Sequence, residues 1–146
     1  MAVNMLDICH TNVRSLNSDK IDFIRAELVE NFDIICLTET NLPHANVEHL
    51  LLKGFHEIIR KDRVGRTGGG VGVYVAQHIS AVRMLEYEIP DLEALWLKVK
   101  AGYNVSMLGV CYRPPNSKVE FWTKLQDSLD LVKQSWVNNI LFDWRL

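Results

Sequence analysis

The sequence lacks long apolar runs and has few cysteines, and both absences exclude whole classes of protein. No hydrophobic stretch approaches the roughly 20 residues of a membrane-spanning helix, and the N-terminus lacks the layout of a signal peptide. The three cysteines, Cys9, Cys36 and Cys111, show no Cys-x-x-Cys spacing, and their odd number argues against a disulfide framework. We therefore expect an intracellular protein, nuclear or cytoplasmic, without membrane contact.

An excess of charge of one sign is also missing. The 16 lysines and arginines nearly balance the 18 aspartates and glutamates, so any binding of nucleic acid must come from a local patch. The five histidines show no metal-ligand spacing, which argues against a zinc site. The sequence contains no repeats, and its 146 residues are typical of a single domain with its own core.

The glycine-rich stretch Gly68–Gly72 is not a nucleotide-binding fingerprint. It lacks the Lys-Ser/Thr pair of a P-loop, and the residues after it predict a strand rather than a helix. A hairpin turn is the better interpretation. The cations around this turn are either a solvated face or a set of phosphate contacts, and both readings stay open: Arg60, Lys61, Arg63 and Arg66.

Hydrophobic patterning predicts strands and helices over almost the whole chain. A strand at 3–11, a helix capped by Ser18 and reaching about Phe32, and a strand at 33–40 form a strand-helix-strand unit with parallel strands. Ser117-Lys118-Val119-Glu120 reads as a capping box, which opens a second helix. Further strands are expected at 56–63, 71–75, 82–87, 94–100, 104–112 and 138–142.

Glu39 ends the strand that is expected to be buried on both faces, and it is the strongest candidate functional residue. Ligands and metals in α/β sheets collect at the carboxyl ends of such strands. Asn12 ends the strand that we expect beside it, so an amide and a carboxylate would share one edge. Oxygen ligands of this kind suit magnesium. Tyr112 closes another strand, where its hydroxyl either packs or bonds a phosphate oxygen.

Taken together, these residues resemble the endonuclease/exonuclease/phosphatase superfamily, which includes DNase I-like and apurinic-site nucleases. Within it, the sequence most resembles the endonuclease domains of non-LTR (LINE-type) retrotransposons. The stretches that carry the resemblance occur in the family's order: 12–16, 37–40, 58–63, 68–71, 95–97 and 112–115. The resemblance implies an α+β fold, a DNase I-like α/β sandwich of two packed sheets flanked by helices. It also implies phosphodiester hydrolysis that depends on Mg²⁺ or Mn²⁺, with DNA as the partner.

The resemblance assigns roles residue by residue. Glu39 matches the metal-binding glutamate, Asn12 the asparagine that organises metal and phosphate, and Tyr112 the tyrosine that supports the scissile phosphate. Asp143 matches the aspartate of the family's Gly-Asp-x-Asn motif only if the glycine were deleted, and no asparagine follows two residues later. The candidate DNA contacts are Arg14, Arg60, Lys61, Arg63, Arg66 and Arg113.

The family's Ser-Asp-His motif, which supplies the general-base histidine, does not occur in this sequence. We therefore expect the N-terminal portion of one such domain, with part of the second sheet missing and with little or no activity of its own. Three alternatives stay open: a phosphoesterase of the same fold acting on a lipid or small phosphate ester, a non-catalytic nucleic-acid-binding remnant, and an unstable product without a role. No stable protein partner is inferred.

Overall fold

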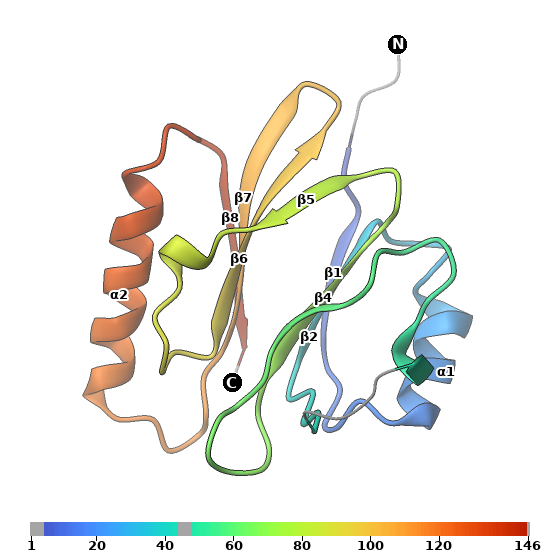
Figure 1. The fold of residues 1–146 in the computed structure, drawn as a ribbon, viewed down its shortest axis with the longest axis horizontal. Helices are drawn as coiled ribbons and strands as arrows, with labels where there is room; N and C mark the ends of the chain where they lie inside the picture. The colour runs from blue at the N-terminus through green and yellow to red at the C-terminus, as the bar shows by residue number, and fades with distance from the viewer. Residues whose placement is uncertain (1–4, 44–47, 146) are drawn as a thin grey trace.

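Two four-stranded sheets pack face to face in the computed structural model, which describes residues 5–43 and 48–145 (Figure 1). The first sheet has the order β1-β2-β4-β3 and contains β1 (Ile8–Asn12), β2 (Ile34–Thr38), β3 (Ile59–Lys61) and β4 (Val71–Val75). The second has the order β5-β6-β7-β8 and contains β5 (Ser80–Arg83), β6 (Ala94–Ala101), β7 (Asn104–Tyr112) and β8 (Ile140–Arg145). Both sheets are mixed, because β1 and β2 are parallel and so are β7 and β8. The predicted α+β sandwich is confirmed.

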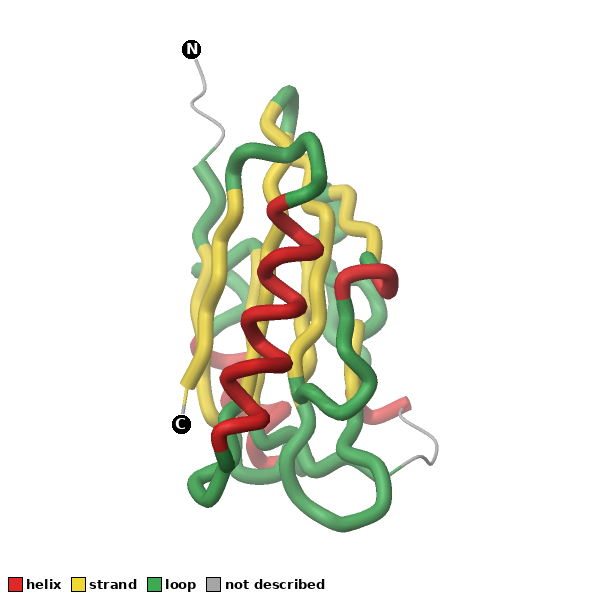
Figure 2. The backbone as a smooth tube through the Cα atoms, turned by 90° about the vertical axis from the view of Figure 1, so that its left-hand side faces the viewer, coloured by secondary structure: helices red, strands yellow, loops and turns green. Residues whose placement is uncertain are grey.

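One helix covers the outer face of each sheet. The helix α1 (Ser18–Glu27) lies outside the first sheet and α2 (Val119–Lys133) outside the second (Figure 1). Figure 2 shows α2 running along the second sheet, where Val132 packs with the fully buried Trp96. Trp96 donates its indole N–H to Ser128 Oγ at 2.9 Å, so the buried polar group is satisfied. Between the sheets, apolar residues of β2, β4, β6 and β7 form one continuous core.

The predicted strand-helix-strand unit is confirmed, with three corrections to the bounds of its first strand and its helix. Asn17, not Ser18, caps α1, because its side-chain oxygen accepts from the Lys20 amide at 3.0 Å. The helix ends at Glu27 rather than near Phe32. At this end the Asn31 side chain donates to the Glu27 carbonyl at 2.9 Å. The predicted strand at 3–11 begins at Ile8 in the structure, and residues 1–4 lie outside the described part.

The glycine-rich stretch belongs to the loop of a hairpin, as predicted. β3 and β4 are antiparallel, and residues 62–70, here called the glycine loop, connect them. Gly68, Gly69 and Gly70 all have positive φ, which explains why glycine is needed there. β3 is shorter than the predicted 56–63: the ladder is interrupted after an isolated bridge between Phe55 and Ala76, and the loop begins directly after Lys61.

Two further predictions, one about the second sheet and one about the start of α2, were wrong. Of the predicted strand at 82–87, only Val82 and Arg83 belong to a strand, which is β5 (Ser80–Arg83), and a 3₁₀ turn follows at η2 (Leu85–Tyr87). The turn is closed by Arg83, which donates two hydrogen bonds to Glu88 at 2.9 and 2.8 Å. The capping box is also absent, because Ser117 donates its hydroxyl to Pro114 O at 2.6 Å and Lys118 takes the cap position without a side-chain bond.

Candidate active site

The centre of the candidate site is a hydrogen bond between the two sheets. Glu39 directly follows β2 of the first sheet, and Tyr112 is the last residue of β7 in the second. The Tyr112 hydroxyl donates to Glu39 Oε1 at 2.6 Å. Burial, and then this bond, raises the pKa of Tyr112 to about 12, so the phenol stays a protonated donor at neutral pH. The bond joins residues that lie 73 positions apart in the sequence.

Asn12 lies at the same edge as Glu39. In the parallel β1–β2 ladder Asn12 is paired with Thr38, the residue before Glu39. The loop after Asn12 is fixed against this strand end, because the Ser15 amide donates to the Glu39 carbonyl at 2.8 Å. The Asn12 side-chain oxygen accepts from the Arg14 amide at 3.1 Å. The predicted adjacency of the two strand ends is therefore confirmed, while the chemical roles of Asn12 and Glu39 stay predictions.

Unusual backbone conformations concentrate at this edge. Within residues 5–43 and 48–145, the non-glycine residues with positive φ are Arg14, Ser15, Glu39 and Asn41. Such conformations cost of order 1–3 kcal/mol each and persist where surrounding contacts enforce them, often at functional sites. Here Asn41 supplies such contacts, since it donates to Ser15 Oγ at 2.9 Å and accepts from the Gly68 amide at 2.8 Å. The edge is thus built from three loops that hold one another.

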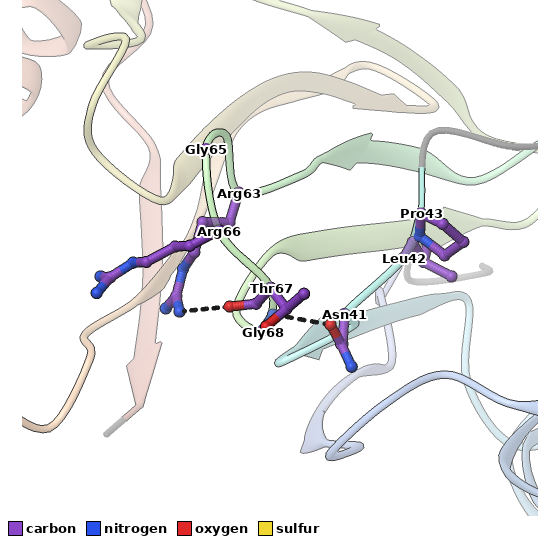
Figure 3. A pocket seen from close by; sticks show the side chains of 8 residues that line it. All are labelled: Asn41, Leu42, Pro43, Arg63, Gly65, Arg66, Thr67 and Gly68. Carbon is purple, nitrogen blue, oxygen red and sulfur yellow. Dashed lines mark hydrogen bonds between the residues drawn. The ribbon is translucent and has the colours of Figure 1, made fainter.

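A cleft of about 380 Å³ opens beside Glu39 and Tyr112. Its other lining residues come from the glycine loop and from the turn after β7: Arg63, Arg66, Gly68, Gly69, Pro114, Pro115, Asn116 and Ser117. A second hollow of about 300 Å³ is lined by residues of the glycine loop and by Asn41, Leu42 and Pro43 (Figure 3). Arg66 lines both hollows and is exposed, and it forms no ion pair among the described residues.

The other cations of the glycine-rich hairpin have partners within the protein. Arg60 lies 3.2 Å from Asp62, and Arg63 donates two hydrogen bonds to Glu93. The Lys61 ammonium donates to Ile89 O at 2.8 Å, and burial lowers its pKa. Arg66 is the cation of this set that is most available to a ligand, whereas the role of all four as DNA contacts stays a prediction.

The two remaining predicted DNA contacts lie at separate points around the site. Arg14 is exposed in the loop after β1, next to the Glu39 edge. Arg113 follows Tyr112 and stacks its guanidinium over the Trp122 ring, 4.9 Å from the ring centroid. Their contact with DNA likewise stays a prediction.

Asp143, in β8 of the second sheet, contacts His10 of β1 in the first sheet, a residue that the sequence analysis missed. Its Oδ2 lies 2.7 Å from His10 Nδ1, and His10 Nε2 lies 3.2 Å from Thr38 Oγ1. The His10 side chain is only 2% exposed. Because side chains alternate along a strand, His10 shares a face of β1 with Asn12, which was an available signal. The histidines were considered only for metal-ligand spacing, and His10 was therefore overlooked.

A profile of the endonuclease/exonuclease/phosphatase family matches residues 9–140. The chain belongs to this family. No curated protein matches the chain significantly. Within the described part of the chain, every helix is too short or too polar to cross a membrane.

Solved structures show the same fold at low sequence identity. The endonuclease domain of TRAS1, a telomere-specific non-LTR retrotransposon, aligns with a TM-score of 0.70 and 10% identity over 95% of this chain and 59% of its own. A mannosyl-6-phosphatase of Bacteroides thetaiotaomicron aligns with a TM-score of 0.65 and 14% identity, over 96% of this chain and 64% of its own. An AP endonuclease from Archaeoglobus fulgidus aligns with a TM-score of 0.61 and 20% identity, over 96% of this chain and 56% of its own. The chain thus spans less than two thirds of each of these structures.

Enzymes of the endonuclease/exonuclease/phosphatase family generally depend on a divalent metal. The oxygen donors at this edge are of the kind that a hard cation takes. Glu39 offers a carboxylate of which one oxygen is bonded to Tyr112, and Asn12 offers an amide oxygen. The described residues contain no group of three or more His, Cys, Asp or Glu side chains that could hold a metal ion by themselves. A single carboxylate suits Mg²⁺, which keeps several waters and completes its shell with phosphate oxygens.

Proposed function

We propose that this chain carries the metal- and phosphate-binding part of a metal-dependent DNA endonuclease of the retrotransposon type. The observation that carries the proposal is the Tyr112–Glu39 hydrogen bond, at the rim of a cleft that also presents Arg66. Family membership supports a phosphodiesterase-type hydrolase. Likeness to an endonuclease domain of a non-LTR retrotransposon and to an AP endonuclease favours DNA as substrate.

In this proposal Glu39 and Asn12 hold Mg²⁺ or Mn²⁺, which when bound would neutralise charge on the phosphodiester. Tyr112 remains protonated, because its pKa is raised to about 12. Its single hydroxyl proton is bonded to Glu39 here, so donating to a phosphate oxygen would require Tyr112 to exchange that bond when Glu39 binds the metal. Arg66 attracts the DNA backbone from the glycine loop. Asp143, which contacts His10, would take the place of the residue that orients the attacking water only if the glycine of the family's Gly-Asp-x-Asn motif is deleted here.

We further propose that the 146-residue chain alone binds metal and DNA but cleaves slowly or not at all. Of the described residues that line the cleft, none is a histidine and only Glu39 is a carboxylate. Glu39 is assigned to the metal, so a separate group that could take a proton from water is missing from this lining.

Nicking of supercoiled plasmid tests both parts of the proposal. The chain, Glu39→Ala and the control Glu57→Ala, which replaces an exposed glutamate, are compared with Mg²⁺ and with EDTA. We expect no nicking above background, together with Mg²⁺-strengthened duplex binding that Glu39→Ala loses and Glu57→Ala keeps. Mg²⁺-dependent nicking that disappears only in Glu39→Ala would overturn the inactivity and establish the nuclease. Duplex binding that depends on neither Mg²⁺ nor Glu39 would instead indicate a non-catalytic nucleic-acid-binding protein.

A phosphoesterase acting on a small ester is the second candidate. The observation in its favour is the likeness to a mannosyl-6-phosphatase, together with a cleft volume of about 380 Å³. Competition distinguishes the two candidates: duplex DNA should displace a labelled duplex at far lower concentration than an inositol phosphate. The reverse order would favour the small ester.

A further inference from the structure

Glu93, which directly precedes β6, is bonded to both walls of the cleft. Its carboxylate accepts from the Gly70 amide at 2.7 Å and from Arg63 at 3.2 and 3.0 Å. Its backbone carbonyl accepts from the Tyr112 amide at 2.8 Å. The Glu93 side chain is only 13% exposed, and this buried charge is matched by that of Arg63. One residue therefore connects the glycine loop of the first sheet to the strand that carries Tyr112.

The glycine loop is shaped to fit the Glu93–Arg63 pair. A Cβ atom built on Gly69 would lie 2.1 Å from Glu93 Oε1 and 2.4 Å from Arg63 Nη2, so the backbone passes directly against the ion pair. Gly69 also has a φ of +60°, which side chains rarely adopt. The loop is held on its other side by Asn41, which accepts from the Gly68 amide. Glu93 and Asn41 thus contact this cleft wall from two sides.

We propose that Glu93 is a positioning residue: it fixes the glycine loop, and with it Arg66, relative to Tyr112 and Glu39, so that the cleft is preformed for a nucleic-acid phosphate. The identity of the ligand rests on the proposed function, whereas the positioning of the loop does not. A loop that is already ordered loses less conformational entropy when the ligand binds. Loosening the loop should therefore weaken DNA binding even though every cation remains.

The test compares Glu93→Ala with Glu93→Gln. Both variants remove the same charge, but only glutamine keeps an oxygen that can accept from Gly70 and Arg63. We expect hydrogen exchange of the Gly70 amide to rise about tenfold or more in Glu93→Ala and to stay near wild type in Glu93→Gln. Affinity for a labelled duplex oligonucleotide should fall in Glu93→Ala and stay near wild type in Glu93→Gln. Should Glu93→Ala not fold, Glu93→Asp, which keeps the charge but shortens the side chain, is expected to behave as the alanine variant would.

Glu88→Ala is the matched control. Glu88 is bonded by Arg83 in a similar two-bond pair, and its side chain is 5% exposed. Among the described residues its hydrogen bonds do not reach Gly68–Gly70. Glu88 also lies 3.8 Å from Lys61 Nζ, a candidate DNA contact, so this control is compared by exchange alone. The variant should lose stability to a similar extent while Gly70 exchange stays unchanged.

The inference is overturned if alanine and glutamine at position 93 give equal Gly70 exchange. It is also overturned if Glu93→Ala binds DNA as tightly as wild type or more tightly, since the freed Arg63 would then matter more than the loop's position. If wild type binds no duplex, the proposed function fails, and the exchange comparison alone decides whether Glu93 positions the loop.

Discussion

At the scale of single residues, the site depends on a neutral tyrosine held against a charged carboxylate. Tyr112 is 3% exposed, and its hydroxyl finds its partner in Glu39. A hydrogen bond to a charged group contributes about 1.5–3 kcal/mol. The bond also orients one Glu39 oxygen, so the tyrosine contributes to the geometry of the proposed metal ligand as well as to stability.

Tyr112→Phe should lower the free energy of unfolding by about 1.5–3 kcal/mol at neutral pH, and this difference should depend on pH in one direction only. Free tyrosine has a pKa of about 10, and that of Tyr112 is raised to about 12. The folded state therefore holds this proton more tightly than the unfolded state, so the stabilisation is fully present below about pH 10 and is lost toward pH 12. Urea titrations of both proteins across this range measure the difference. A difference that grows above about pH 10 would contradict the assignment.

At the scale of the elements, two glycines of the glycine loop are needed for different reasons, one for its backbone conformation alone and one also for close packing. Gly65 and Gly69 both have positive φ, but a Cβ on Gly65 would meet nothing within 4 Å, whereas one on Gly69 would meet Glu93 and Arg63. The two positions therefore separate backbone strain from a steric clash within one loop.

Gly65→Ala should cost about 1 kcal/mol from strain alone, and Gly69→Ala about 2 kcal/mol or more. Gly69→Ala should also weaken duplex binding, because the loop must move away from Glu93, while Gly65→Ala should leave binding unchanged. Thermal unfolding and fluorescence anisotropy with a labelled duplex measure the two effects. Equal losses of stability and binding at both positions would refute the close packing.

The elements themselves could largely be predicted from local patterns. The run from Ile34 to Leu37 predicted a buried strand, and the glycines after Arg66 predicted a hairpin turn rather than a phosphate cradle. The errors arose where a side chain had a competing partner: Ser117 bonds Pro114 instead of capping α2, and Arg83 pairs with Glu88 where the strand was expected to continue. Such choices depend on three-dimensional contacts that a linear pattern does not contain.

At the scale of the whole molecule, the site exists because the two sheets pack against each other. Glu39 comes from the first sheet and Tyr112 from the second, and His10 and Asp143 are likewise divided between them. The sequence suggested that Glu39, Asn12 and Tyr112 would share a rim, because each ends a strand. It could not identify Glu93, whose side-chain partners lie 23 or more positions away and follow only from the packing. His10 could have been found from its place two residues before Asn12, but its contact with Asp143 could not.

The central claim is that this inter-sheet edge is a divalent-metal site, and calorimetric titration with Mn²⁺ tests it most directly. Wild type, Glu39→Gln and the exposed control Glu57→Gln are compared, since each variant exchanges one carboxylate for an amide. We predict one Mn²⁺ site in wild type, an affinity at least about tenfold weaker in Glu39→Gln, and no change in Glu57→Gln. Equal affinity in wild type and Glu39→Gln, or no Mn²⁺ binding by folded wild type, would contradict the account.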